Sequence, residues 1–165
     1  MSELVALGLR CTGWLAAILL TASLTVTPLV RLRASRGAAR PRLLAARRWL
    51  GIVAASLALA HGAVALFTYL QPEPWSALRE NPWLRSGALA AVLLAALLAT
   101  SCPVVVRGAR VVLWKPLHRL VYVAPVLVVH HLLLAPFAPR AWVLTLAVVL
   151  AGALLGRLLR PAPRA

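Results

Sequence analysis

The four histidines are the residues of this sequence best suited to do chemistry. His61, His118, His130 and His131 lie within long apolar stretches. An ionisable side chain is costly to keep among apolar groups and usually serves a function there. A neutral imidazole has one N–H and one nitrogen lone pair, so it can bind a metal or join two helices by a hydrogen bond. For His61 taken alone, the hydrogen bond between helices is the alternative to a ligand role.

The apolar stretches are too long and too numerous for a water-soluble fold. Of the 165 residues, 62% are hydrophobic, whereas soluble domains have about 45–50%. A membrane-spanning helix needs about 20 mainly apolar residues. Windows of this kind lie at 12–30, 49–70, 87–106, 111–134 and 141–159. The sequence therefore predicts an all-α integral membrane protein, a single domain over residues 1–165 that forms a bundle of about five transmembrane helices.

The positive charge of the chain indicates how these helices are oriented. There are 18 Lys and Arg residues against 3 Asp and Glu, a net charge of +15. Most arginines lie in short connections between apolar windows. There they set the orientation of the membrane helices and contact lipid headgroups, and this distribution does not suggest nucleic-acid binding. The positive-inside rule predicts a multi-pass protein of a bacterial inner membrane with its N-terminus outside and its C-terminus in the cytoplasm. The segment 71–84, with Trp75 and Trp83, should then lie at the outer surface.

The two cysteines give no sign of redox chemistry. Cys11 and Cys102 are predicted on opposite sides of the membrane, and neither belongs to a C-x-x-C pair. Covalently attached haem and iron–sulfur clusters therefore have no support. We expect both to be small buried thiols.

Histidines on the second and fourth predicted helices could share a cofactor. These two helices run in the same direction, so side chains at similar depth can face each other across a bundle. A haem with one axial imidazole from each helix fits this pattern, and it would transfer electrons because both open iron positions are filled. Zinc or copper is the alternative, but no carboxylate or thiolate lies nearby in sequence to complete a shell. His130 and His131 cannot both face the bundle, because adjacent helical residues diverge by about 100°.

Short motifs along the chain carry a family resemblance. They are Thr27-Pro28-Leu29, Arg47-Arg48 followed by Leu50-Gly51, His61, Asn81-Pro82-Trp83 before Gly87, Thr100-Ser101, Trp114, Leu117-His118, Val121-Tyr122 and His131. Their order and spacing, from about residue 12 to residue 159, resemble the MsrQ-type haem-binding membrane subunits of bacterial methionine sulfoxide reductase systems. These belong to the ferric reductase-like transmembrane domain superfamily. The resemblance implies that domain, with haem b present as one or two groups.

The resemblance also implies a ligand set. In oxidase relatives, two histidines on each of two helices hold two stacked haems, and the matching positions here are Arg47 and His61, and His118 and His131. His61 with His131 would hold an outer haem. His118 faces an arginine, so an inner haem would need another ligand or a five-coordinate iron. The thirteen residues between His118 and His131 turn an ideal helix about 140° from a common face, a mismatch that Pro125 could reduce by rewinding the helix.

Further residues are candidates for the haem pocket. Arg47, Arg48 and Arg119 are expected near the inner surface, where guanidinium groups could pair with haem propionates. Anchoring of the inner membrane surface is the alternative for these arginines. Trp114 and Tyr122 could line the pocket, with ordinary helix packing as the alternative.

Together these features predict a haem b electron-transfer subunit, not a stand-alone enzyme. No flavin or nicotinamide domain follows the last predicted helix, so we expect electrons from a cytoplasmic flavin reductase or from membrane quinol, with FMN or quinone as further candidate cofactors. The resemblance implies a periplasmic molybdopterin oxidoreductase, the catalytic subunit of a sulfoxide reductase, as acceptor. Family members often have an extra helix before the one that ends in Thr-Pro-Leu. We expect this chain to depart from the family pattern there, because no apolar window precedes residue 12. The alternatives are a ferric or other metal reductase with a separate flavoprotein donor, and a haem-free scaffold or transporter.

Overall fold

The computed structural model describes residues 3–32, 39–101 and 118–158, and no strand occurs in these three ranges. The elements in chain order are α1 (Glu3–Leu32), α2 (Ala39–Val64), the π-helical turn η1 (Ala65–Tyr69), α3 (Pro74–Glu80), α4 (Pro82–Ala99), the 3₁₀ turn η2 (Leu120–Tyr122), α7 (Val123–Leu134) and α8 (Arg140–Leu158). The all-helical prediction is confirmed.

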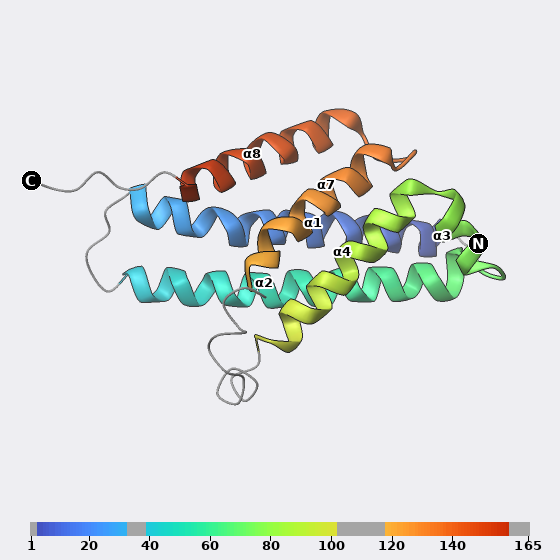
Figure 1. Cartoon of the computed structure of the whole chain (residues 1–165), viewed down its shortest axis with the longest axis horizontal. Helices are drawn as coiled ribbons and strands as arrows, with labels where there is room; N and C mark the ends of the chain where they lie inside the picture. The colour runs from blue at the N-terminus through green and yellow to red at the C-terminus, as the bar shows by residue number, and fades with distance from the viewer. Residues whose placement is uncertain (1–2, 33–38, 102–117, 159–165) are drawn as a thin grey trace, which may run out of the picture.

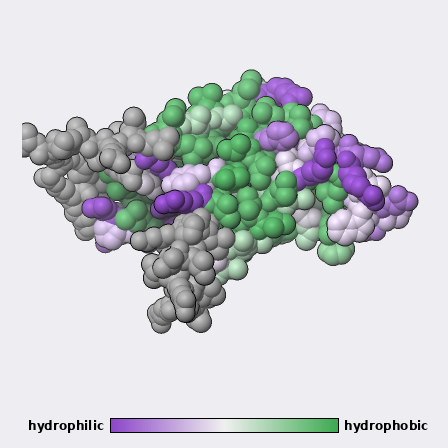
Figure 2. All heavy atoms as spheres, in the orientation of Figure 1, coloured by the Kyte–Doolittle hydropathy of each residue, from purple (hydrophilic) through white to green (hydrophobic). Residues whose placement is uncertain are grey.

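The helices have the length and surface of membrane-spanning segments. Within the described ranges, four are long and apolar enough to cross a membrane, at Glu3–Val30, Arg40–Thr68, Pro82–Ala99 and Arg140–Arg157, and a shorter apolar helix covers Leu120–Leu134. Large apolar side chains such as Val92 and Val148 point outward, 66% and 72% exposed. Figure 2 shows a broad hydrophobic band over the middle of the bundle. Such a surface suits lipid and not water, so the chain is a multi-pass membrane protein.

Several helices begin before the apolar windows that the sequence marks. The helices predicted from residues 12 and 49 begin at Glu3 and Ala39, and the one predicted from residue 87 begins at Pro82. Hydropathy marks only the apolar part of a helix, whereas arginine, alanine and leucine continue a helix beyond it. Pro82 occupies the first turn of α4, where a missing N–H costs nothing. Residues 102–106 of the third predicted window and 111–117 of the fourth lie outside the described residues.

The bundle has two distinguishable ends (Figure 1). The start of α1, α3 and the start of α4 gather at one, which we call the α3 end. The start of α2, with Arg40, Arg42, Arg47 and Arg48, lies at the opposite end together with the ends of α1 and α8. We call this the arginine-rich end. The separation matches the clustering of arginines on one side that the sequence predicted.

A core shared by five helices joins the two ends. α1 packs along α2 and α8, and α4 packs against α2 and α7. The buried core contains small residues from several helices, which let the backbones approach closely. Its members are Leu20, Leu24, Ala54, Ala55, Leu94, Ala124 and Leu150. Cys11 is not buried as predicted but exposed on α1, which a thiol tolerates because it behaves as a small apolar group.

Candidate functional site

His61 and His131 come together near the α3 end of the bundle. His61 lies in the last turn of α2 and His131 on α7. Their ring centroids are 6.5 Å apart, with the ring planes at 80°. Both side chains are half-buried, and both line the same cavity. The structure thus brings together the two imidazoles that the sequence placed on the second and fourth predicted helices.

Each of the two rings forms a hydrogen bond to a backbone carbonyl of a neighbouring helix. His61 Nδ1 lies 2.9 Å from the carbonyl oxygen of Leu9 on α1. His131 Nδ1 lies 2.7 Å from the carbonyl oxygen of Trp83 on α4. A carbonyl oxygen only accepts, so Nδ1–H is the donor in both bonds. In the neutral imidazole the lone pair then lies on Nε2, the nitrogen left to bind a metal.

Two glycines lie directly against these rings. A Cβ atom on Gly13 would be 3.0 Å from His61 Cε1, and one on Gly87 would be 2.7 Å from His131 Nδ1. Any larger residue would therefore displace the ring. From the sequence, Gly87 was named only as part of a motif and Gly13 was not considered. The available signal was a glycine inside an apolar helix, which costs about 1 kcal/mol relative to alanine and so calls for a packing reason.

The cavity around the histidines suits a mainly apolar ligand with an acidic group. Its volume is about 610 Å³, and most of its lining comes from apolar side chains of α1, α2, α4 and α7. Small-molecule and cofactor sites commonly measure about 300–1,000 Å³. Among the described lining residues, Arg10 is the one with a formal charge. Sequence reasoning had assigned Arg10 no part in the site.

The two imidazoles suit a metal whose remaining ligands are supplied by a cofactor. Within the described residues, no group of three or more His, Cys, Asp or Glu could hold a metal ion, and two imidazoles alone leave tetrahedral zinc unsatisfied. An imidazole nitrogen binds a first-row metal such as zinc at about 2.0–2.1 Å and lies about 1.1–1.2 Å from its ring centre. Two imidazoles on opposite sides of one metal therefore have centres about 6.2–6.6 Å apart. The observed 6.5 Å matches this spacing. A haem, whose macrocycle supplies four nitrogens, is compatible with these residues.

The other two histidines lie elsewhere. His130 is exposed, as expected for a residue that diverges from His131 by about 100°. His118 is half-buried and lies close enough to Arg47 for their charges to interact. The 3₁₀ turn η2 lies between His118 and α7. Its three residues turn by about 120° each, against about 100° in an α-helix, so the angle between the directions of His118 and His131 falls from about 140° to about 80°. Neither residue lines the cavity of His61 and His131.

The predicted arginines and Tyr122 lie toward the arginine-rich end. Arg48 Nη2 donates to the Ser101 carbonyl oxygen at 2.9 Å, and Arg119 is exposed. Arg157, which the sequence assigned only to topology, lies over the Tyr122 ring at 5.5 Å and is close enough to Arg47 for their charges to interact. Tyr122 does not line the cavity near His61.

Arg157 itself is held by α1, since its Nε and Nη2 donate to the Leu24 carbonyl oxygen at 3.2 and 2.9 Å. Trp114, the remaining predicted pocket residue, lies outside the described residues.

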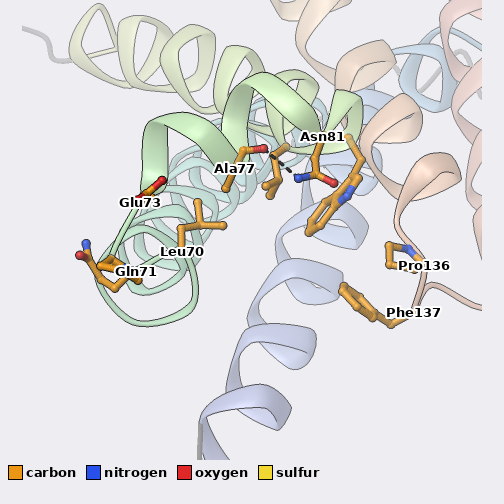
Figure 3. A pocket seen from close by; sticks show the side chains of 10 residues that line it. Leu70, Gln71, Glu73, Ala77, Asn81, Pro136 and Phe137 are labelled. Atoms are coloured by element: carbon orange, nitrogen blue, oxygen red, sulfur yellow. Dashed lines mark hydrogen bonds between the residues drawn. The ribbon is translucent and has the colours of Figure 1, made fainter.

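A second, shallower pocket lies at the α3 end (Figure 3). Its volume is about 480 Å³, and it lies between the segment 70–73, α3, the start of α4 and the turn from α7 to α8. Asn81 Nδ2 donates to the Ala77 carbonyl oxygen at 2.9 Å, the dashed line in Figure 3. Trp83 lines both this pocket and the histidine cavity. Its ring centroid lies 5.5 Å from that of His131 and 5.8 Å from that of Phe137.

Fold and site together define a multi-pass helical membrane protein with a cavity lined by two histidines. The family described as "Ferric reductase like transmembrane component" matches residues 12–129. The chain is 35% identical over 157 residues to the Protein-methionine-sulfoxide reductase heme-binding subunit MsrQ of Deinococcus radiodurans, covering 92% of this chain and 73% of that protein. It is 34% identical over 125 residues to the protein of the same name from Ralstonia nicotianae, covering 74% of this chain and 55% of that protein. The chain belongs to the MsrQ-type members of the ferric reductase-like transmembrane family, as its motifs predicted.

Proposed function

We propose that the chain is a membrane subunit that transfers electrons through haem b, with His61 and His131 as the two axial ligands. The observation that carries this proposal is the 6.5 Å separation of the two rings inside an apolar cavity. The two curated relatives, which are named heme-binding subunits, support the same cofactor. Haem b supplies a one-electron carrier when bound.

The residues around the cavity favour electron transfer over substrate chemistry. His61 and His131 would hold the haem together, and a haem held by two imidazoles would supply electron transfer and not the binding of oxygen or a substrate. The lining is mainly apolar, and the polarity around a metal controls its redox potential. Arg10 would pair with a propionate, the acidic group that an otherwise apolar lining must accommodate.

The cluster at the arginine-rich end would serve a second, inner haem. Arg47 precedes His61 by fourteen residues on α2, about 21 Å along a helix that rises 1.5 Å per residue. Arg47 is therefore too far away for a propionate of a haem held by His61. We assign His118 as ligand of the inner haem, with Arg47, Arg48 and Arg119 as partners for its propionates. Trp114 and Tyr122 belong to this same proposal.

The electron route follows from the proposed orientation. With the arginine-rich end in the cytoplasm, the N-terminus is outside and the outer haem lies toward the periplasm. The donor is then a cytoplasmic flavin reductase or membrane quinol, with FMN or quinone as its carrier. The acceptor is a periplasmic molybdopterin oxidoreductase that reduces protein methionine sulfoxide. The chain spans 73% and 55% of the two relatives, and these partners are proposals for the chain itself.

Visible absorption of the purified protein tests the proposal. We expect b-type bands in the reduced-minus-oxidised spectrum and a low-spin ferric resonance signal. In His61→Ala the main low-spin signal should be lost and the b-type bands of the outer haem should disappear. Protein that carries no haem after expression with added haem precursor would refute the proposal and favour a haem-free scaffold or transporter.

Donor and acceptor are tested with the haem-loaded protein. Reduced quinol and a flavin reductase with NADH are compared as donors. Reoxidation by a molybdopterin sulfoxide reductase supports the proposed acceptor, whereas reoxidation by ferric chelate alone supports the metal reductase that the family description suggests.

A further inference from the structure

The contacts of His61 are repeated at His131. In each case the histidine of one helix lies against a glycine of another, Gly13 of α1 or Gly87 of α4. In each case the carbonyl oxygen that accepts from Nδ1 belongs to the residue four positions before that glycine, Leu9 or Trp83. The same arrangement of imidazole, glycine and carbonyl thus occurs twice.

Helix geometry explains why the glycine and the carbonyl go together. A side chain on a helix points back over the preceding turn and covers the surface there. The carbonyl of residue i−4 lies in that turn and already accepts the N–H of residue i. A glycine at i leaves this oxygen open to a second donor. At Gly13 and Gly87 an added Cβ would meet the ring at 3.0 Å and 2.7 Å, so alanine would displace the ring that makes the hydrogen bond.

We propose that Gly13 and Gly87 are positioning residues that fix the tautomer of the two histidines. Each glycine exposes one backbone carbonyl, the carbonyl binds Nδ1–H, and Nε2 keeps its lone pair for a metal. Only this last consequence rests on the haem proposed above. Nδ1–H bonds to an acceptor also raise the basicity of a ligand imidazole. A more basic ligand favours ferric over ferrous iron, so loss of either bond should raise the midpoint potential.

The remaining glycines provide matched controls. A Cβ on Gly8, on the same helix as Gly13, would meet nothing within 4 Å, and the same holds for Gly62, next to His61. A Cβ on Gly156 would meet Pro28 Cβ at 3.0 Å. Gly156→Ala therefore creates a steric contact as close as that of Gly13→Ala, but with a proline and not a histidine.

The first test does not need haem. Haem-free protein labelled with ¹⁵N-histidine is examined by NMR, with His61→Ala and His131→Ala used for assignment. We expect the proton on Nδ1 in both histidines. Gly13→Ala should change only the His61 signal and Gly87→Ala only that of His131, while Gly8→Ala and Gly62→Ala change neither tautomer. A proton on Nε2 of both rings in the unsubstituted protein would overturn the proposal, whether or not the protein binds haem.

The second test uses haem-loaded protein. Gly13→Ala and Gly87→Ala should each weaken haem binding about 10–100-fold, the usual effect of losing a hydrogen-bond partner of a ligand, and should raise the midpoint potential of the haem retained. Gly156→Ala should match the unsubstituted protein in both measurements. An equal loss of haem in Gly156→Ala would show that helix packing causes the effect and would overturn the positioning role. Absence of haem together with the expected tautomers would refute the proposed function and leave the positioning of the imidazoles supported.

Discussion

Adjacent histidines on α7 offer a sharp comparison, because His131 faces the cavity and His130 is exposed. In His131→Ala the haem-free protein loses the 2.7 Å hydrogen bond to Trp83 and the ring contact at 5.5 Å. A hydrogen bond contributes about 0.5–1.5 kcal/mol, and a ring pair contributes about 0.5–1.5 kcal/mol. The free energy of unfolding should therefore fall by about 1–3 kcal/mol. His130→Ala should change it by no more than about 0.5 kcal/mol, as is usual for exposed positions.

Two measurements separate the variants. Denaturant unfolding of haem-free protein in detergent gives the stability difference, and the low-spin ferric signal per protein gives the axial ligation. We expect His131→Ala to lose the signal, because the iron keeps one imidazole only, and His130→Ala to retain it. Loss of the signal in His130→Ala with retention in His131→Ala would refute the assignment of the ligand and the contacts on which it rests.

Four more predictions follow from the described residues. Arg10→Gln should weaken haem binding about twofold to fivefold in a haem titration, since an exposed ion pair contributes about 0–1 kcal/mol. Arg10→Lys should keep most of the haem affinity. Equal affinity in all three proteins would contradict the propionate contact. His118→Ala should leave the low-spin signal of the outer haem intact in resonance spectra and remove only a second haem, so loss of the main signal would contradict two separate sites. Cys11→Ser should not alter the haem spectrum, because Cys11 is exposed on α1, and a changed spectrum would show that its thiol contacts the haem. A fluorescent reporter at the C-terminus that folds only in the cytoplasm should be active, and activity of an export-dependent reporter there would reverse the proposed orientation.

The sequence predicted the features that depend on side-chain type. Long apolar windows indicated the helices, and ionisable side chains inside them singled out His61 and His131. Helix ends were less predictable, because hydropathy does not report where a polar helix continues, as at the start of α2. The carbonyls of Leu9 and Trp83 could not be predicted, since every residue has a carbonyl and only the packing of helices decides which one meets a ring.

The neighbours of residues at the edges of the site could not be predicted, because they come from other helices. Arg47 and His61 share α2, but sequence alone does not say which other helices lie beside each of them. The approach of Arg157 from α8 to Tyr122 likewise depends on tertiary packing.

The position of Trp83 bears on how well the proposed redox centre is insulated. Its ring contacts His131 on one side and lines the shallow pocket of the α3 end on the other. At this place Trp83, Leu70, Leu84 and Phe137 line both the histidine cavity and the shallow pocket, so the two hollows share these side chains as a common wall. Electron tunnelling weakens steeply with the thickness of the intervening material. A partner protein seated in the shallow pocket would therefore be separated from the proposed redox centre only by these shared side chains.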